Sequence, residues 1–205
     1  MRLFAELFKI DANTTVLDMG GDAFNWSMTA SRPTLTILNI YDPDNKLPGA
    51  TYIVGDGCDT GLPAKAFDIV FSNSVIEHVG SSEKRRKFAA ECMRCGKSFF
   101  VQTPNRWFPF DTHTLMPLIH WLPQRVFSKL VPISPRFLFF KADPGDFEDL
   151  KNLHLLTKKE LQDLFPTATI IEEKFLGITK SLIAISAVPG RSAHGGTVRA
   201  DSGKL

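Results

Sequence analysis

Polar side chains and glycines stand at the ends of four short apolar runs in this chain, where they could bind a ligand. They are Asp18 and Gly20, then Asn39, then Asp56 with Gly57 and Cys58, and finally Asn73. The carboxyl ends of parallel strands meet at one edge of an open α/β sheet, and such sheets bind their ligands there. Glycine lets the backbone approach a ligand closely, and carboxylate and amide oxygens accept its hydrogen bonds. The pattern therefore predicts a small-molecule site at one sheet edge.

Three residues farther along the chain could move a proton. His78 follows the fourth run, and Asp111 and His113 follow the fifth. Histidine titrates near neutral pH and can act as an acid or a base. A structural interpretation stays open for each of them. Glu77 and His78 would form the first turn of a helix, whose positive end suits glutamate, and Asp111 and His113 would belong to a loop held by local polar contacts.

The cysteines do not indicate a metal site. Cys92 and Cys95 have C-x-x-C spacing, but a structural zinc ion needs four ligands and the chain has no second pair. We expect both thiols on one buried helix face and no bound metal. Residues 1–13 lack the apolar stretch of a secretory signal, and no apolar run approaches the roughly 18 residues that span a bilayer. We therefore expect reduced thiols and a cytoplasmic protein.

Seven runs rich in β-branched and apolar residues are the candidate strands that would position these residues. They cover 14–18, 35–40, 51–54, 67–73, 98–103, 168–172 and 181–187. Several are continuously apolar, which is typical of strands covered on both faces. We expect an α/β fold with a doubly wound, mostly parallel, seven-stranded sheet. The connection over 40–50 is too short for a helical crossover, so the second helix is expected to be vestigial.

Helix signals lie between the later runs. Ser81 or Ser82 caps a helix that runs to Cys95, and a capping box begins another helix at Thr157. The last two runs follow without a helix between them. This order predicts an antiparallel hairpin at one edge of the sheet, with a turn over 176–180.

The stretch 105–152, called the lid below, interrupts the pattern of strands and helices. It holds six of the chain's 13 prolines among many large apolar residues, which predicts short, broken helices in an inserted segment. Three interpretations stay open: the lid covers the core, it binds a lipid-linked or aromatic acceptor, or it lies shallowly on a membrane surface. Residues 1–188 are expected to form one domain, followed by a disordered tail over 189–205.

Four motifs occur in an informative order. They are V-L-D-M-G-G at 16–21, N-I-Y-D at 39–42, G-D-G-C at 55–58, and F-D-I-V-F-S-N at 67–73, which leads into Glu77-His78. In this order they resemble the class I S-adenosylmethionine-dependent methyltransferases of the type 11 group. The resemblance spans residues 16–105 and continues more loosely to 188. It implies a Rossmann-like fold and S-adenosylmethionine as the cofactor.

For the methionine end of the cofactor, the resemblance implies that Asp18 and Gly20 lie beside the amino acid moiety and that Asn73 lies near the sulfonium. Carboxylate and carbonyl groups suit a cationic sulfonium. Two glycines that are usual in the family's loop are replaced here by Asp22 and Phe24. This departure supports an alternative, a degenerate methyltransferase-like binding module without catalysis.

For the nucleoside end, the resemblance implies that Asp56 accepts a hydrogen bond from the adenine amino group, with backbone contacts from Gly57 and Cys58. The acid usual at the end of the second strand, which meets the ribose hydroxyls, is replaced by Asn39, unless Asp42 takes its place. An amide oxygen still accepts a hydrogen bond from a hydroxyl.

The implied activity is methyl transfer to an acceptor that the motifs do not identify: a small molecule, a sugar or a lipid-linked compound. An oxygen acceptor would need a base, for which His78, His113 and Asp111 are the candidates, whereas a carboxylate would not. A nicotinamide-dependent oxidoreductase is disfavoured because the first turn lacks G-x-G-x-x-G. With 24 basic and 22 acidic residues the net charge is +2, so nucleic acid is not an expected partner. No motif indicates an oligomeric state.

Overall fold

The central sheet has seven strands in the order β3-β2-β1-β4-β5-β9-β8. In a computed structural model, all residues are described except 28, 30–31, 112–113, 140–149, 151–152 and 187–205. The strands are β1 (Thr15–Met19), β2 (Thr34–Asn39), β3 (Thr51–Val54), β4 (Phe67–Asn73), β5 (Gly96–Pro104), β8 (Thr169–Phe175) and β9 (Ile178–Ile185). The first five run parallel, and β9 is antiparallel to β5 and β8. The expected Rossmann-like sheet with an antiparallel edge hairpin is confirmed.

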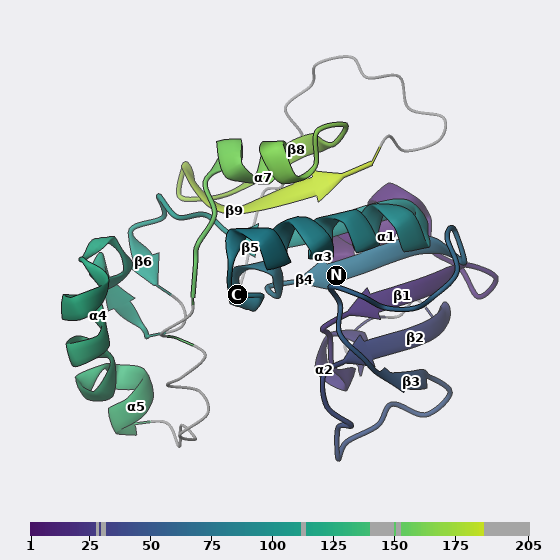
Figure 1. Cartoon of the computed structure of the whole chain (residues 1–205), viewed down its shortest axis with the longest axis horizontal. Helices are drawn as coiled ribbons and strands as arrows, with labels where there is room; N and C mark the ends of the chain where they lie inside the picture. Colours follow the sequence, from purple (N-terminus) through teal and green to yellow (C-terminus); the bar gives the residue numbers. More distant parts are fainter. Residues whose placement is uncertain (28, 30–31, 112–113, 140–149, 151–152, 187–205) are drawn as a thin grey trace.

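Helices cover both faces of this sheet, as a doubly wound fold requires. Helices α3 (Ser82–Cys95) and α7 (Lys158–Leu164) pack on one face, and α1 (Arg2–Phe8) and α2 (Ala23–Ser27) pack on the other. Figure 1 shows α3 lying across the sheet. Strand β4 packs against the helices on both faces of the sheet, since Val70 faces α3 while Ile69 and Phe71 face α1. Its run is continuously apolar because both of its faces are buried.

Side-chain caps set the starts of α3 and α7. The side chain of Ser81 accepts a hydrogen bond of 3.2 Å from the backbone N–H of Lys84, which begins α3. Cys92 and Cys95 are both fully buried on the inner face of this helix, as predicted. Thr157 forms the predicted capping box at the start of α7. Between β2 and β3, residues 40–50 form turns and bends without a helix.

The edge hairpin is tighter than the sequence suggested. Phe175 pairs with Ile178, so the turn consists of Leu176 and Gly177 alone. Their φ angles are 48° and 84°, and positive φ at both positions is what a two-residue type I′ turn requires. The expected turn over 176–180 is therefore wrong, because β9 begins three residues before the predicted run.

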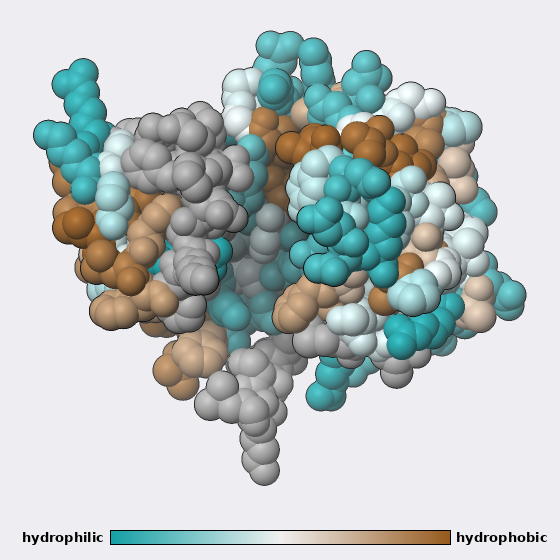
Figure 2. Space-filling view, turned by 90° about the horizontal axis from the view of Figure 1, so that it is seen from below, coloured by the Kyte–Doolittle hydropathy of each residue, from teal (hydrophilic) through white to brown (hydrophobic). Residues whose placement is uncertain are grey.

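The lid forms short elements beyond β5, to the left of the sheet in Figure 1. They are β6 (Phe110–Asp111), β7 (Met116–Pro117), η2 (Ile119–Trp121), α4 (Gln124–Leu130), η3 (Val131–Ile133) and α5 (Pro135–Phe139). A small core of Ile119, Phe127, Val131 and Leu150 holds them together. Figure 2 shows brown, hydrophobic side chains on this part of the surface beside teal, hydrophilic ones. No helix in the described ranges is long and apolar enough to cross a membrane.

Candidate active site

A cavity of about 410 Å³ opens at the carboxyl ends of β1, β2 and β3. Its size lies in the range of ordinary ligand clefts, about 300 to 1,000 Å³. Six of the predicted site residues line it: Gly20, Asn39, Asp56, Gly57, Cys58 and His78. Asp18 and Asn73 are not on this lining, and neither is Phe24, whose side chain is 65% exposed. The structure thus brings most of the predicted residues onto one cavity wall, whereas Asp18 and Asn73 stand near the ends of β1 and β4 at the same sheet edge without lining it.

Two adjacent glycines form the turn beside this cavity, and each is required by its surroundings. Gly20 has a φ of 81°, and a Cβ there would lie 2.5 Å from a methyl carbon of Val75. A Cβ on Gly21 would lie 1.9 Å from Oδ2 of Asp18. The turn therefore follows a path open only to glycine, packed directly over the Asp18 carboxylate.

Asp18 lies beneath this turn rather than on the cavity wall. It is fully buried, and its Oδ2 accepts a hydrogen bond of 2.6 Å from Nε1 of Trp26. Burial raises the pKa of Asp18 to about 7, which outweighs the opposing effect of the Trp26 hydrogen bond. Its other oxygen, Oδ1, has no hydrogen-bond partner in the described part of the chain. Asp18 is thus a buried carboxyl that is poised between its two protonation states near neutral pH.

Asn39 connects β2 to the glycine turn. Its Nδ2 donates a hydrogen bond of 2.9 Å to the carbonyl of Gly21, and its Oδ1 accepts one of 2.8 Å from the backbone of Ile40. Asp42, the alternative for the ribose contact, does not line the cavity and forms an ion pair of 2.7 Å with Lys46. Of the two, only Asn39 stands where a ligand could be reached.

Asp56 and Cys58 form the opposite side of the cavity. Oδ1 of Asp56 accepts a hydrogen bond of 2.8 Å from the backbone N–H of Cys58. The Cys58 thiol donates to the carbonyl of Lys84 over 3.4 Å. Burial, with the nearby Asp56 charge as the next cause, raises the pKa of Cys58 to about 11. The thiol is therefore neutral at physiological pH and is suited to packing rather than to nucleophilic chemistry.

The residues that sequence reasoning missed here are mainly apolar. Ile40 and Tyr41 line the cavity although their side chains are 75% and 54% exposed. Two large, exposed apolar residues directly after a strand end are the signal that could have found them. Phe88 and Val79 complete an apolar wall suited to a flat ring.

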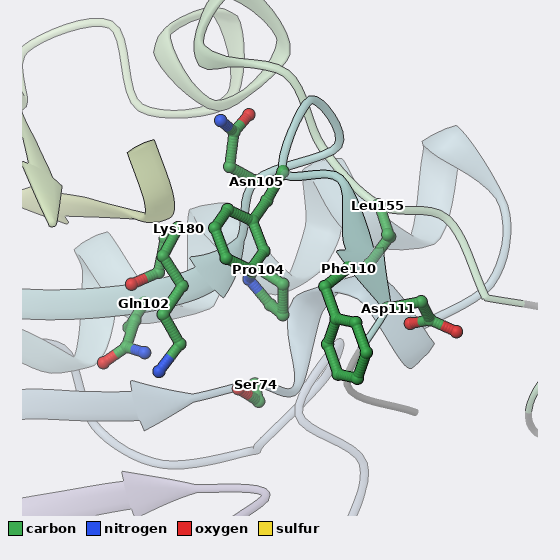
Figure 3. Close-up of a pocket in the computed structure, with 10 residues that line it drawn as sticks. Ser74, Gln102, Pro104, Asn105, Phe110, Asp111, Leu155 and Lys180 are labelled. Atoms are coloured by element: carbon green, nitrogen blue, oxygen red, sulfur yellow. The ribbon is translucent and has the colours of Figure 1, made fainter. Parts of the chain in front are cut away.

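A second, smaller cavity of about 160 Å³ lies at the ends of β5 and β9 (Figure 3). It is lined by Ser74, Gln102, Pro104, Asn105, Phe108, Phe110, Asp111, Leu155, Lys180 and Ser181. Ser74 also lines the larger cavity, so the two meet at that residue. Ser74, Gln102 and Lys180 were not predicted as site residues. Gln102 sits near the end of β5, where the sheet-edge argument could have included it.

The predicted proton carriers are divided between the two cavities. His78 lines the larger cavity, in the short helix η1 (Ile76–His78), and Asp111 lines the smaller one. Asp111 is buried, and its Oδ2 accepts hydrogen bonds from the N–H of Thr114 over 3.1 Å and from its hydroxyl over 2.5 Å. His113 lies outside the described residues. Asn73, just before Ser74, has a buried Oδ1 without a partner in the described ranges.

Comparison with known proteins bears on the fold and on the first half of the chain. Residues 4–98 match the model of a family described as a methyltransferase domain. No curated protein matches the sequence.

Solved structures resemble the chain at low sequence identity. A SAM-dependent methyltransferase from Archaeoglobus fulgidus is 12% identical over 90% of both chains, with a TM-score of 0.56. One from Aquifex aeolicus is 11% identical over 90% of this chain and 86% of its own, with a TM-score of 0.52. A protein from Rhodobacter sphaeroides that carries the name of Zn-dependent alcohol dehydrogenases is 12% identical over 90% and 87%, with a TM-score of 0.60. At these identities the likeness is one of fold.

Proposed function

We propose that this chain is a class I methyltransferase that binds S-adenosylmethionine in the larger cavity; its fold and the family match over residues 4–98 support the proposal. The acceptor would enter the smaller cavity. The observation that carries this proposal is that Ser74 lines both cavities, so that a donor and an acceptor would meet at one residue.

The residues of the larger cavity suit an adenosyl group. Asp56 offers a carboxylate oxygen to the adenine amino group, and only its Oδ1 is engaged by the Cys58 backbone. Leu38, Ile40 and Phe88 supply an apolar wall for the ring. Asn39 offers its amide oxygen to a ribose hydroxyl.

The methionine end would lie toward the glycine turn and the end of β4. The buried Oδ1 atoms of Asp18 and Asn73 lack partners in the described part of the chain, and a buried acceptor without a donor is costly. Neither residue lines the larger cavity, so a ligand ammonium would be attracted by their charge and dipole from behind the cavity wall and not by direct contact. Asp18 would act from beneath the turn, where Gly21 packs directly against its carboxylate.

When bound, S-adenosylmethionine supplies a methyl group on a cationic sulfonium, and S-adenosylhomocysteine remains after transfer. The chain's own contribution is alignment, since holding two reactants in the correct geometry accounts for a large part of such rate gains. His78 and Asp111 line different cavities, so they serve different partners. Asp111 is the one that an acceptor would approach.

The alternative of a binding module without catalysis rests on Asp22 and Phe24, which replace loop glycines. Neither closes the cavity. Oδ1 of Asp22 accepts a hydrogen bond of 2.8 Å from the N–H of Phe24, and the Phe24 ring points into solvent. The two substitutions thus leave room for a nucleoside.

Calorimetry with S-adenosylhomocysteine tests the proposal. We expect the full chain to bind one equivalent and to give no heat with NAD. Asp56→Asn should weaken binding roughly tenfold, because a hydrogen bond to a charged group is worth about 1.5 to 3 kcal/mol. Asp42→Asn, at a nearby acid outside the cavity, should leave binding unchanged. The proposal fails if S-adenosylhomocysteine does not bind, or if the two variants bind alike.

A further inference from the structure

The smaller cavity contains two polar side chains that are not used by the fold. The Lys180 ammonium and the Gln102 amide form no side-chain hydrogen bond or ion pair within the described residues. Figure 3 shows both side chains on the same side of Pro104, with Ser74 beneath them. The two therefore present N–H donors to the space that adjoins the larger cavity.

A bulge in β9 sets the position of Lys180. Lys174 pairs with Thr179, and the neighbouring Glu173 pairs with Ser181, which leaves Lys180 as an extra residue without a partner on β8. On the other side, its carbonyl accepts a hydrogen bond of 2.9 Å from the backbone N–H of Asn105. Bulges redirect side chains and are frequent beside active sites. The hairpin thus holds Lys180 at the cavity by its backbone geometry.

Lys180 is exposed, and no acid among the described residues around this cavity forms an ion pair with it. Asp111 is the acid on the lining, but Thr114 supplies two donors to it, and Figure 3 shows its carboxylate turned away from Lys180. Glu173, on the neighbouring strand, accepts a hydrogen bond from the Ser181 hydroxyl. Lys180 is the one cation on the described lining, which matches a monoanionic ligand group better than a dianion. Phe108, Phe110 and Leu155 make the rest of the wall apolar.

We propose that the smaller cavity binds a carboxylate of the methyl acceptor, with the Lys180 ammonium and the Gln102 amide N–H as its donors. The inference rests on the proposed function in one respect only, that the ligand of this cavity is the acceptor. It narrows the acceptor to a compound with a monoanionic group and an apolar body. A carboxylate placed there lies next to the larger cavity, because Ser74 lines both cavities.

Matched acids and amides test this inference on the full chain. Benzoate and phenylacetate would be titrated by calorimetry against benzamide and phenylacetamide, with and without saturating S-adenosylhomocysteine. We expect each acid to bind at least tenfold more tightly than its amide. Lys180→Met should abolish the difference, and Lys180→Arg should retain it. Lys174→Met, on the partner strand and outside both cavities, should bind as the wild type does.

The outcomes separate this inference from the proposed function. If S-adenosylhomocysteine binds but the acids bind no better than the amides, the carboxylate site is refuted and the proposed function stands. A preference for acids that persists in Lys180→Met, or tighter binding of inorganic phosphate than of benzoate, also refutes it. If acids bind through Lys180 while S-adenosylhomocysteine does not bind, the anion site stands and the proposed function falls. Thermal unfolding of each variant verifies that it is folded.

Discussion

Oδ2 of Asp18 and Nε1 of Trp26 lie 2.6 Å apart in the core, joined by a hydrogen bond that ties the end of β1 to α2. Both residues are almost completely buried, with exposed fractions of 0% and 1%. The bond stabilises the charged form of Asp18, but burial has the larger effect and raises the pKa to about 7. Asp18 is ionisable and lies just beneath the larger cavity. Its protonation therefore makes the stability of the fold depend on pH.

Asp18→Asn should flatten the pH dependence of stability. The folded-state pKa of Asp18 is raised from an ordinary value near 4, so the folded chain holds a proton that the unfolded chain releases between about pH 4 and 7. The free energy of unfolding of the wild type should therefore fall as pH rises through this window, by up to about 4 kcal/mol at about 1.4 kcal/mol per unit. Urea unfolding at pH 5 and pH 8 measures the difference.

Asp68→Asn is the matched control with the opposite sign. The Lys97 ammonium and the Thr15 hydrogen bonds lower the pKa of Asp68 to about 2. The contribution of Asp68 to the free energy of unfolding is therefore fully present above about pH 4 and is lost as pH falls toward 2. This variant should lose stability at pH 8, and the loss should shrink as pH falls from about 4 toward 2. Equal pH profiles for Asp18→Asn and the wild type would contradict the assignment of Asp18.

Gly21→Ala should destabilise the chain by roughly 2 to 4 kcal/mol, because its Cβ would lie 1.9 Å from Oδ2 of Asp18 in a buried site. Gly55→Ala is the control, since the nearest atom to its Cβ would be at an ordinary 3.7 Å. Denaturant midpoints give both values. A Gly21→Ala protein as stable as Gly55→Ala would show that the turn is not packed on Asp18.

Cys58 should react slowly with iodoacetamide, and its rate should still be rising at pH 10. Its pKa of about 11 leaves roughly two orders of magnitude less thiolate at pH 8 than an ordinary cysteine has. S-adenosylhomocysteine should slow the reaction further, because Cys58 lines the larger cavity. Mass spectrometry of the modified peptide follows the rate, with the buried Cys92 and Cys95 as unreactive internal controls. An ordinary rate at pH 8 would be incompatible with this environment.

The membrane interpretation of the lid predicts binding to anionic liposomes. Of the 16 exposed large hydrophobic residues in the described part of the chain, nine lie from Trp107 to Phe139, and Leu138 and Phe139 are 61% and 79% exposed. Changing both of these to serine should reduce cosedimentation several-fold, whereas Leu176→Ser, at the 88% exposed tip of the edge hairpin, should not. If the wild type stays in the supernatant, this interpretation is refuted and the other two remain.

The sequence alone was sufficient to predict the sheet, the presence of a hairpin at its edge and the starts of α3 and α7, because these features depend on neighbouring residues. The run at β4 is apolar throughout since both faces are covered, and Ser81 and Thr157 cap helices through backbone groups only three residues away. Strand ends also located Gly20, Asn39 and Asp56 at a common edge, since parallel strands share their direction.

The tertiary structure alone decided which of these side chains reach a cavity. Asp18 is buried because Gly21 folds over it and Trp26 bonds to it, and Lys180 faces the smaller cavity because a bulge shifts the pairing of β9 with β8. Gln102 and Lys180 are far apart in the chain and meet only where β5 and β9 lie side by side. Such contacts depend on strand register and on packing between distant segments, whereas a sequence pattern records only the spacing of near neighbours.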